Sequence, residues 1–261
     1  MKHALIFDCD GVLTDGEQRF HLRAFNQMWE ELGVSWRWSE EEYAQKLKIS
    51  GGKERLASLY QEAAFRAAVA VPKTAEEWQA LVCEWHRRKT QIYLNLIATE
   101  GIPPRSGVKR LSEEAVCAGW TLAVASSGSR ESVEAVVRHV MGKKLAEHIA
   151  VFAGDMVRVK KPAPDLYLLT SRALAVPSWN CLVIEDSRNG LLACCAAHMK
   201  CIITPTRLTR DEDFSEADLV ISCLGDPESE ECHIIQNRCN VSIERYVRLE
   251  NLLELFGSTV M

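Results

Sequence analysis

The sequence lacks three features that would each point to a particular class of protein. Its 261 residues include ten cysteines but no C-x-x-C pair, and Cys194 and Cys195 are adjacent. This spacing suits neither a zinc site nor an ordinary disulfide, so we expect reduced thiols, many of them buried. No apolar run reaches the roughly 18 residues that a membrane span needs. The basic residues form no long clusters and the net charge is −5, which argues against a nucleic-acid or membrane partner.

A leader peptide is also not expected, because residue 4 already lies in the first predicted strand. We therefore expect a cytoplasmic protein, or one of the plastid stroma if the numbering starts at a processed mature form. We expect a monomer.

Short apolar runs alternate with helical patterns along much of the chain. Such alternation predicts an α/β fold with a parallel sheet that is covered on both faces. The predicted strands lie at residues 4–8, 121–127, 149–155, 181–187, 201–205 and 218–222, with helices at 130–141, 164–175 and 188–198. A final amphipathic helix is predicted over 242–256, after a polar stretch at 225–241 that carries no functional signal.

Residues 17–100 contain long helical patterns and no convincing strand. They predict a helical unit inserted between the first strand and the rest of the sheet. The segment "GIPPRSG" (101–107) is interpreted as the return linker, because consecutive prolines and flanking glycines break helices.

Two carboxylates end the first predicted strand in "ALIFDCDGVLTD" (4–15). Asp8 and Asp10 point to the same side of an extended chain, which is costly unless a cation lies between them or one is protonated. A solvated turn is the alternative, since D-G is a common turn dipeptide. A second strand, however, ends in Glu185 and Asp186, and parallel strands present such residues at one edge. Together they indicate an oxygen-ligand site for Mg²⁺, with Asp8 as nucleophile and Asp10 as proton shuttle.

Two further strand ends carry groups that suit a phosphate. Ser126 in "AVASSGS" offers a hydroxyl, and the small residues after it leave backbone amides free to bind an oxyanion. Lys161 in "RVKKPAPD" can connect the nucleophile to the phosphoryl charge. Either feature alone is typical of a surface loop, but four such clusters at strand ends predict a phosphoryl-transfer site.

These four motifs, in this order, resemble those of the haloacid-dehalogenase superfamily. "DCDGVLTD" matches the first motif, Ser126 the second, "KKPAPD" the third and "EDSRNG" the fourth. The resemblance implies a Rossmann-like core (1–16 and 101–261) with a helical cap (17–100) inserted after the first strand. It also implies an aspartyl-phosphate on Asp8. Mg²⁺ would be held by Asp8, the backbone carbonyl of Asp10, and Asp186, with Glu185 outside the direct ligands.

The helical segment carries a second resemblance. "GGKER" (51–55), with "HLRAFN" (21–26) and "VSWRWSEEEY" (34–43), resembles the CbbY-type group, which is close to the β-phosphoglucomutases. The known members of that group are xylulose-1,5-bisphosphate phosphatases, so a small sugar bisphosphate is the implied partner. The residues expected to contact it are Glu17, His21, Gly51, Gly52, Lys53, Glu54, Arg55, Ser126, Ser127, Gly128, Ser129 and, as our own addition, Arg130. A glycine-led helix start with a solvated Lys53 and Arg55, and a packed helix histidine at position 21, are the alternatives.

The predicted function is therefore a Mg²⁺-dependent sugar-bisphosphate phosphatase. A sugar phosphomutase shares its first half-reaction, and the motifs do not separate the two. A catalytically silent binding protein is disfavoured because the nucleophile is intact. A metal-free dehalogenase is disfavoured because it would not need Asp10 and Asp186.

Overall fold

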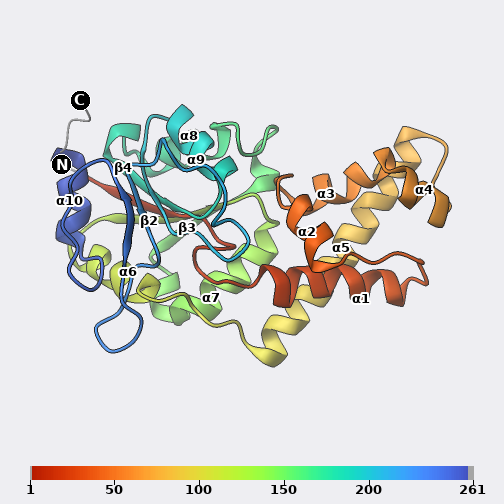
Figure 1. Ribbon diagram of the computed structural model, residues 1–261, viewed down its shortest axis with the longest axis horizontal. Helices are drawn as coiled ribbons and strands as arrows, with labels where there is room; N and C mark the ends of the chain where they lie inside the picture. The colour runs from red at the N-terminus through yellow and green to blue at the C-terminus, as the bar shows by residue number, and fades with distance from the viewer. Residues whose placement is uncertain (1, 258–261) are drawn as a thin grey trace. The chain divides into compact units, whose positions relative to one another are not determined.

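The computed structural model describes residues 2–257 (Figure 1). Its main feature is a sheet of seven strands in the order β3-β2-β1-β4-β5-β6-β7. The strands are β1 (Ala4–Phe7), β2 (Thr121–Ser126), β3 (Ile149–Ala153), β4 (Cys181–Glu185), β5 (Lys200–Ile203), β6 (Leu219–Ile221) and β7 (Ile234–Asn237). The first six pair in parallel, and β7 joins β6 antiparallel. The predicted α/β class with a parallel sheet is confirmed.

The central strands are uniformly apolar because both of their faces are buried. Every residue of β1 and of β4 is buried, as expected for a parallel sheet with helices on both sides. Ala4 in β1 is aligned with Thr121 in β2 and with Cys181 in β4. The carboxyl ends of these three strands therefore meet at one edge of the sheet.

Helices cover this sheet in the unit formed by residues 2–15 and 102–257. They are α6 (Val108–Cys117), α7 (Arg130–Ala146), α8 (Asp165–Leu174), α9 (Arg188–Ala196) and α10 (Leu249–Gly257), with 3₁₀ turns at Gly154–Met156 and Ser178–Asn180. Helices α6 and α8 contact β2, α7 contacts β3, and α9 contacts β5. One continuous apolar core joins Ile6 and Val183 of the strands to Leu166 of α8 and Leu191 of α9.

The predicted helix over 242–256 is wrong in its first half. Helix α10 begins only at Leu249. Before it, the backbone bonds to other segments: Cys232 N–H donates to the Arg245 carbonyl (2.7 Å) and Val247 N–H to the Leu224 carbonyl (2.8 Å). These bonds use the groups that a helix would need. The polar stretch at 225–241 contains the unpredicted edge strand β7.

Residues 16–101 form a second unit. Its elements are a π-helical turn η1 (Glu17–Leu22), α1 (Arg23–Glu31), α2 (Glu40–Lys46), α3 (Gly52–Ser58), a 3₁₀ turn η2 (Leu59–Gln61), α4 (Ala63–Ala68) and α5 (Ala75–Glu100). Capping boxes start two of these helices, Ser39 with Glu42 for α2 and Thr74 with Glu77 for α5. Within residues 2–257, no helix combines the length and the apolarity required to span a bilayer.

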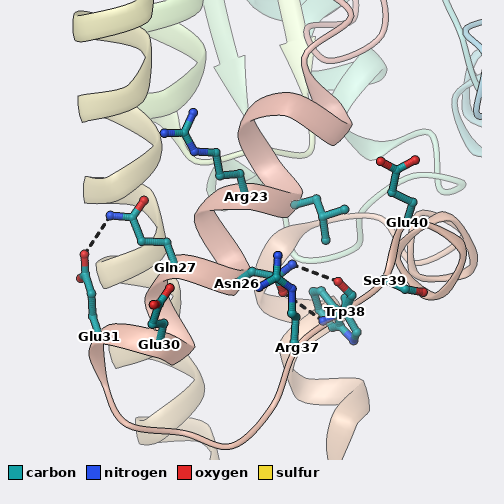
Figure 2. A pocket seen from close by; sticks show the side chains of 10 residues that line it. Arg23, Asn26, Gln27, Glu30, Glu31, Arg37, Trp38, Ser39 and Glu40 are labelled. Carbon is teal, nitrogen blue, oxygen red and sulfur yellow. Dashed lines mark hydrogen bonds between the residues drawn. The ribbon is translucent and has the colours of Figure 1, made fainter.

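Buried aromatic rings and one amide hold the helical unit together. Trp29 and Trp38 are fully buried and meet edge to face, with ring centroids 4.8 Å apart. The Asn26 side chain in α1 holds the loop that leads to α2: its amide donates to the Trp38 carbonyl and its oxygen accepts from the Trp38 N–H, both at 2.9 Å (Figure 2). The tryptophans of this unit thus serve packing.

Candidate active site

Asp8 and Asp10 follow β1 in a tight, internally bonded turn. The Asp8 N–H donates to the Ile184 carbonyl of β4 (2.9 Å), so the strand pairing continues to the first carboxylate. The Gly11 N–H then donates to the Thr14 carbonyl (2.8 Å) and closes the turn. The Asp8 side chain is buried, and that of Asp10 is half-buried. The sheet thus fixes the position of the predicted nucleophile.

Lys161 lies at the centre of the carboxylate cluster. Its ammonium donates to Asp8 Oδ1 (2.5 Å), Glu185 Oε1 (2.6 Å) and the Ala125 carbonyl of β2 (2.9 Å). The side chain is nearly inaccessible, with 5% of the residue exposed. Because an ammonium has three N–H bonds, these acceptors use all of its donors. Lys161 therefore connects the ends of β1, β2 and β4 through one buried charge.

Glu185 is held from several sides. The Tyr167 hydroxyl of α8 donates to Oε1 (2.7 Å), and the Asp186 N–H donates to Oε2 (3.0 Å). Gly190 of α9 packs directly against this carboxylate, since a Cβ atom at that position would lie 1.8 Å from Glu185 Cδ. Because donors occupy both of its oxygens, Glu185 is suited to holding the Lys161 ammonium in position.

Burial and charge set opposite protonation tendencies in this cluster. Burial raises the pKa of Asp8 to about 7, with Lys161 opposing the shift and Glu185 adding to it. Burial alone would lower the pKa of Lys161, but the carboxylates of Asp8 and Glu185 outweigh it and raise it. For Glu185, the effect of burial is outweighed by Lys161, and its pKa is lowered. Lys161 is thus charged beside an ionised Glu185, while the metal-free Asp8 titrates near neutrality.

Asp186 completes a group of three acids. One carboxylate oxygen from each of Asp8, Glu185 and Asp186 lies within 4.8 Å of the other two. The Thr209 hydroxyl donates to Asp186 Oδ2 (3.4 Å). Three buried carboxylates facing a single lysine leave an excess of negative charge, and carboxylate oxygens are the ligands that Mg²⁺ prefers. The residues present fit such an ion.

The loop after β2 lies beside these acids. The Gly128 N–H donates to Ser126 Oγ (3.1 Å), and a Cβ atom on Gly128 would lie 3.9 Å from Asp10 Oδ2. The Ser127 hydroxyl is buried and has no hydrogen-bond partner within the described chain. An unpartnered buried hydroxyl is costly, so Ser127 has a donor left for a group that enters beside it. Ser129 instead donates to Ser132 (2.9 Å).

Arg130 pairs with a residue of its own helix, α7. Its guanidinium pairs with Glu134 one helical turn later (2.7 Å), and more than half of its side chain is exposed. This contact matches a solvated residue in the first turn of α7, and its assistance to the loop stays a prediction.

In the helical unit, Glu17, Tyr43 and Arg55 form one cluster. The Tyr43 hydroxyl donates to Glu17 Oε2 (2.6 Å) and accepts from Arg55 Nη1 (3.0 Å). Arg55 Nη1 also lies 3.7 Å from Glu17 Oε1. Nearby, Gly51 precedes α3 with a positive φ, and Lys53 and Glu54 follow in its first turn. Two of the predicted substrate residues, Glu17 and Arg55, are thus in contact.

His21 is a buried, packed histidine. Its ring stacks on Tyr93 with centroids 4.0 Å apart, and its Nδ1 contacts the ammonium of Lys89. Lys89 lies 4.8 Å from the ring centroids of both Phe25 and Tyr93. Lys89 does not stand out in the sequence, because it lies within a charged helical run, "HRRKT". Tyr167 does not stand out either, because it lies on the buried face of α8.

Comparison with known proteins identifies the family. The model for haloacid dehalogenase-like hydrolases matches residues 2–198. A CBBY-like protein of Arabidopsis thaliana is 40% identical over 230 residues, which are 88% of this chain and 72% of the relative. The chain is a CbbY-type haloacid dehalogenase-like hydrolase. The predicted family is thereby confirmed, and with it the assignment of this chain as a phosphatase.

Solved CbbY structures agree with this assignment. CbbY from Rhodobacter sphaeroides in complex with phosphate is 39% identical with a TM-score of 0.77, covering 85% of this chain and 95% of that one. A mutant of that CbbY has been solved in complex with xylulose 1,5-bisphosphate (38%, TM-score 0.77, with the same coverage). A β-phosphoglucomutase from Clostridium difficile is 20% identical over 98% of both chains (TM-score 0.68), a likeness of fold.

The packing of Gly11 against Asp186 leads to a first prediction. Gly11 has φ +89°, and a Cβ atom there would lie 2.2 Å from Asp186 Oδ2. We expect Gly11→Ala to displace the Asp186 carboxylate and to lower kcat/KM about 100-fold or more, the usual cost of a displacement near 1 Å in an active site.

Gly119→Ala is the matched control, because Gly119 also has a positive φ (+78°) but no atom within 4 Å of the added Cβ. Both variants should lose about 1–2 kcal/mol of unfolding free energy from the backbone conformation. Steady-state kinetics and urea denaturation measure the two effects. Similar kinetics for the two variants would show that Asp186 does not depend on Gly11.

Proposed function

We propose that this chain is a Mg²⁺-dependent phosphatase that hydrolyses a small sugar bisphosphate, with xylulose 1,5-bisphosphate as the first candidate, through an aspartyl-phosphate on Asp8. The observation that carries the proposal is the contact of Asp8 with the buried ammonium of Lys161, beside Glu185 and Asp186. Such a site holds an anionic nucleophile and positive charge at the place where a phosphoryl group must bind.

In the first step, an oxygen of Asp8 attacks phosphorus and the bond from phosphorus to the sugar oxygen breaks. Asp10 donates the proton that the leaving sugar oxygen needs. In the second step, Asp10 takes a proton from water, which attacks the aspartyl-phosphate and releases inorganic phosphate. Asp8 and Asp10 then return to their starting states, so the sum is hydrolysis of one phosphate ester.

Three groups would hold the metal: Asp8, the backbone carbonyl of Asp10, and Asp186. When bound, Mg²⁺ supplies positive charge that offsets the repulsion between carboxylate and phosphate. Glu185 would orient Lys161 rather than bind the ion directly. The Ser126 and Ser127 hydroxyls would donate to phosphoryl oxygens, since Ser127 has no other partner among the described residues.

The bisphosphate preference rests on the helical unit and on the relatives. Arg55 and Lys53 supply positive charge, and Arg55 is oriented by Tyr43 and by the Ile49 carbonyl (3.0 Å). An oriented guanidinium suits a phosphate better than a freely mobile one. The CbbY mutant complex with xylulose 1,5-bisphosphate supports this substrate class. A phosphate-release screen over sugar mono- and bisphosphates, with and without Mg²⁺, tests the proposal, and transfer to a second sugar hydroxyl would indicate a mutase.

The covalent step predicts the behaviour of Asp8→Asn. This variant keeps the shape of the side chain but has no nucleophilic oxygen of comparable strength, so turnover should fall by at least about 1,000-fold. Mass spectrometry of a quenched wild-type reaction should detect a phosphoryl adduct that Asp8→Asn lacks. Far-UV circular dichroism checks that the variant folds. Turnover within tenfold of wild type would contradict an aspartyl-phosphate on Asp8.

The raised pKa of Asp8 predicts a metal-dependent acid limb. Because burial raises this pKa to about 7, Asp8 in the metal-free protein binds a proton as the pH falls below 7. At limiting Mg²⁺, kcat/KM should fall about tenfold per pH unit below that point. Saturating Mg²⁺ competes with the proton and should move the limb to lower pH.

A pH series from 5 to 8 at two Mg²⁺ concentrations measures this shift, with p-nitrophenyl phosphate as substrate. EDTA should abolish activity, and Ca²⁺ should inhibit because its longer bonds fit the site poorly. An acid limb that stays in place at both concentrations, or full activity in EDTA, would contradict metal binding at Asp8.

The role of Arg55 predicts a substrate-specific loss. Removal of a charge-assisted contact of about 1.5–3 kcal/mol should lower kcat/KM for the bisphosphate about 10- to 150-fold in Arg55→Ala. Turnover of p-nitrophenyl phosphate, which has no second phosphate, should change little. Arg66→Ala, at an exposed arginine of α4 that donates to the Tyr60 carbonyl, is the control. Equal losses on both substrates would show that Arg55 supports the fold of the helical unit instead.

A further inference from the structure

Arg105 occupies an unusual position in the return linker. Its guanidinium donates to four carbonyl oxygens: those of Gly11, Thr204 (2.6 Å), Pro205 (3.2 Å) and Ser222 (3.2 Å). It also reaches the Thr204 hydroxyl (3.1 Å). The planar fork of an arginine has five N–H donors and can connect several acceptors at once. The side chain is half-buried, so it is held among backbone atoms rather than extended into solvent.

The acceptors of Arg105 belong to three different strand ends. Gly11 lies in the turn after β1, Thr204 and Pro205 follow β5, and Ser222 follows β6. In the sheet, β4 lies between β1 and β5. Arg105 therefore joins segments on both sides of β4, the strand that leads to Asp186.

Both of these segments contact the Asp186 region. Gly11 packs against the Asp186 carboxylate, as the 2.2 Å approach of an added Cβ shows. On the other side, Thr204 N–H donates to the Glu185 carbonyl (2.7 Å), and Thr209 donates to Asp186 Oδ2 (3.4 Å). The backbone of Arg105 adds a bond to the Leu13 carbonyl (2.9 Å). The turn with Asp8 and Asp10 and the segment that holds Asp186 thus share one arginine.

We propose that Arg105 is a positioning residue for the carboxylate site: by joining the Gly11 turn to the ends of β5 and β6, it fixes the separation between Asp8 and Asp186 and so sets the affinity for a divalent cation. The inference rests on the proposed metal site. Arg105 itself touches neither substrate nor metal. Groups that orient metal ligands typically change metal affinity 10- to 100-fold when they are removed.

The chain offers a matched control. Arg110 is also a half-buried arginine in the same unit, and it donates to the Gly225 carbonyl (2.8 Å) and to Asp226 (3.1 Å). None of the hydrogen bonds described above joins Gly225 or Asp226 to the turn after β1 or to Asp186. Arg105→Met removes five side-chain hydrogen bonds and Arg110→Met removes four, so the two variants should lower the melting temperature in EDTA by comparable amounts.

Direct binding of Mn²⁺, followed by electron paramagnetic resonance without substrate, tests the proposal. Arg105→Met should raise the Mn²⁺ dissociation constant about tenfold or more, and Arg110→Met should leave it within twofold of wild type. Arg105→Lys keeps the charge but loses the fork, so its constant should lie between wild type and Arg105→Met. If Arg105→Met does not fold, Arg105→Lys alone tests the proposal. The Mg²⁺ concentration for half-maximal activity should follow the same order.

Unchanged Mn²⁺ affinity in the folded Arg105 variants would overturn the positioning role, even if they melt earlier, because Arg105 would then serve the fold alone. Equal weakening in Arg105→Met and Arg110→Met would overturn it as well. If wild type itself binds no Mn²⁺, the proposed metal site fails, and this result is distinct from a failure of Arg105.

Discussion

The buried contact of Lys161 with Asp8 and Glu185 is the interaction on which the site depends. A lysine this inaccessible keeps its charge only because two carboxylates and one carbonyl accept its three N–H bonds. In turn, the carboxylates can lie so close together only because the ammonium is between them. Removing Lys161 would leave the carboxylates of Asp8 and Glu185 buried without a positive charge beside them. The contact therefore forms only when the ends of β1, β2 and β4 and the loop that carries Lys161 are all in place.

Much of this arrangement could be predicted from the sequence, because strand ends in a parallel sheet share one edge. The runs that end at Asp8, Ser126 and Glu185 identify three of the strands, and the sheet brings these ends together with Lys161. Local sequence signals suffice here, since the strands are uniformly apolar and each changes abruptly to polar residues. The family follows from the same motifs.

Other features depend on contacts that a local pattern cannot reveal. The segment before α10 has an amphipathic pattern, yet its backbone bonds to Leu224 and Cys232 prevent a helix. Strand β7 is an exposed edge strand and lacks the apolar alternation that predicts strands. Tyr167 and Arg105 act through partners far along the chain, and neither their residue types nor their spacing marks them out. Arg105 lies in a segment that looks like a simple linker.

The pairing of β1 has a consequence for how the protein forms during synthesis. Ala4 pairs only with strands that contain Thr121 and Cys181, so the first strand leaves the ribosome long before either partner exists. The helical unit, a continuous segment from residue 16 to 101, has all of its own contacts available much earlier. We therefore expect the apolar segment 4–7 to remain unpaired until β2 has been made, and to gain its second partner only with β4. In that interval it is an exposed hydrophobic strand of the kind that chaperones bind, and the nucleophile Asp8 is attached to its end.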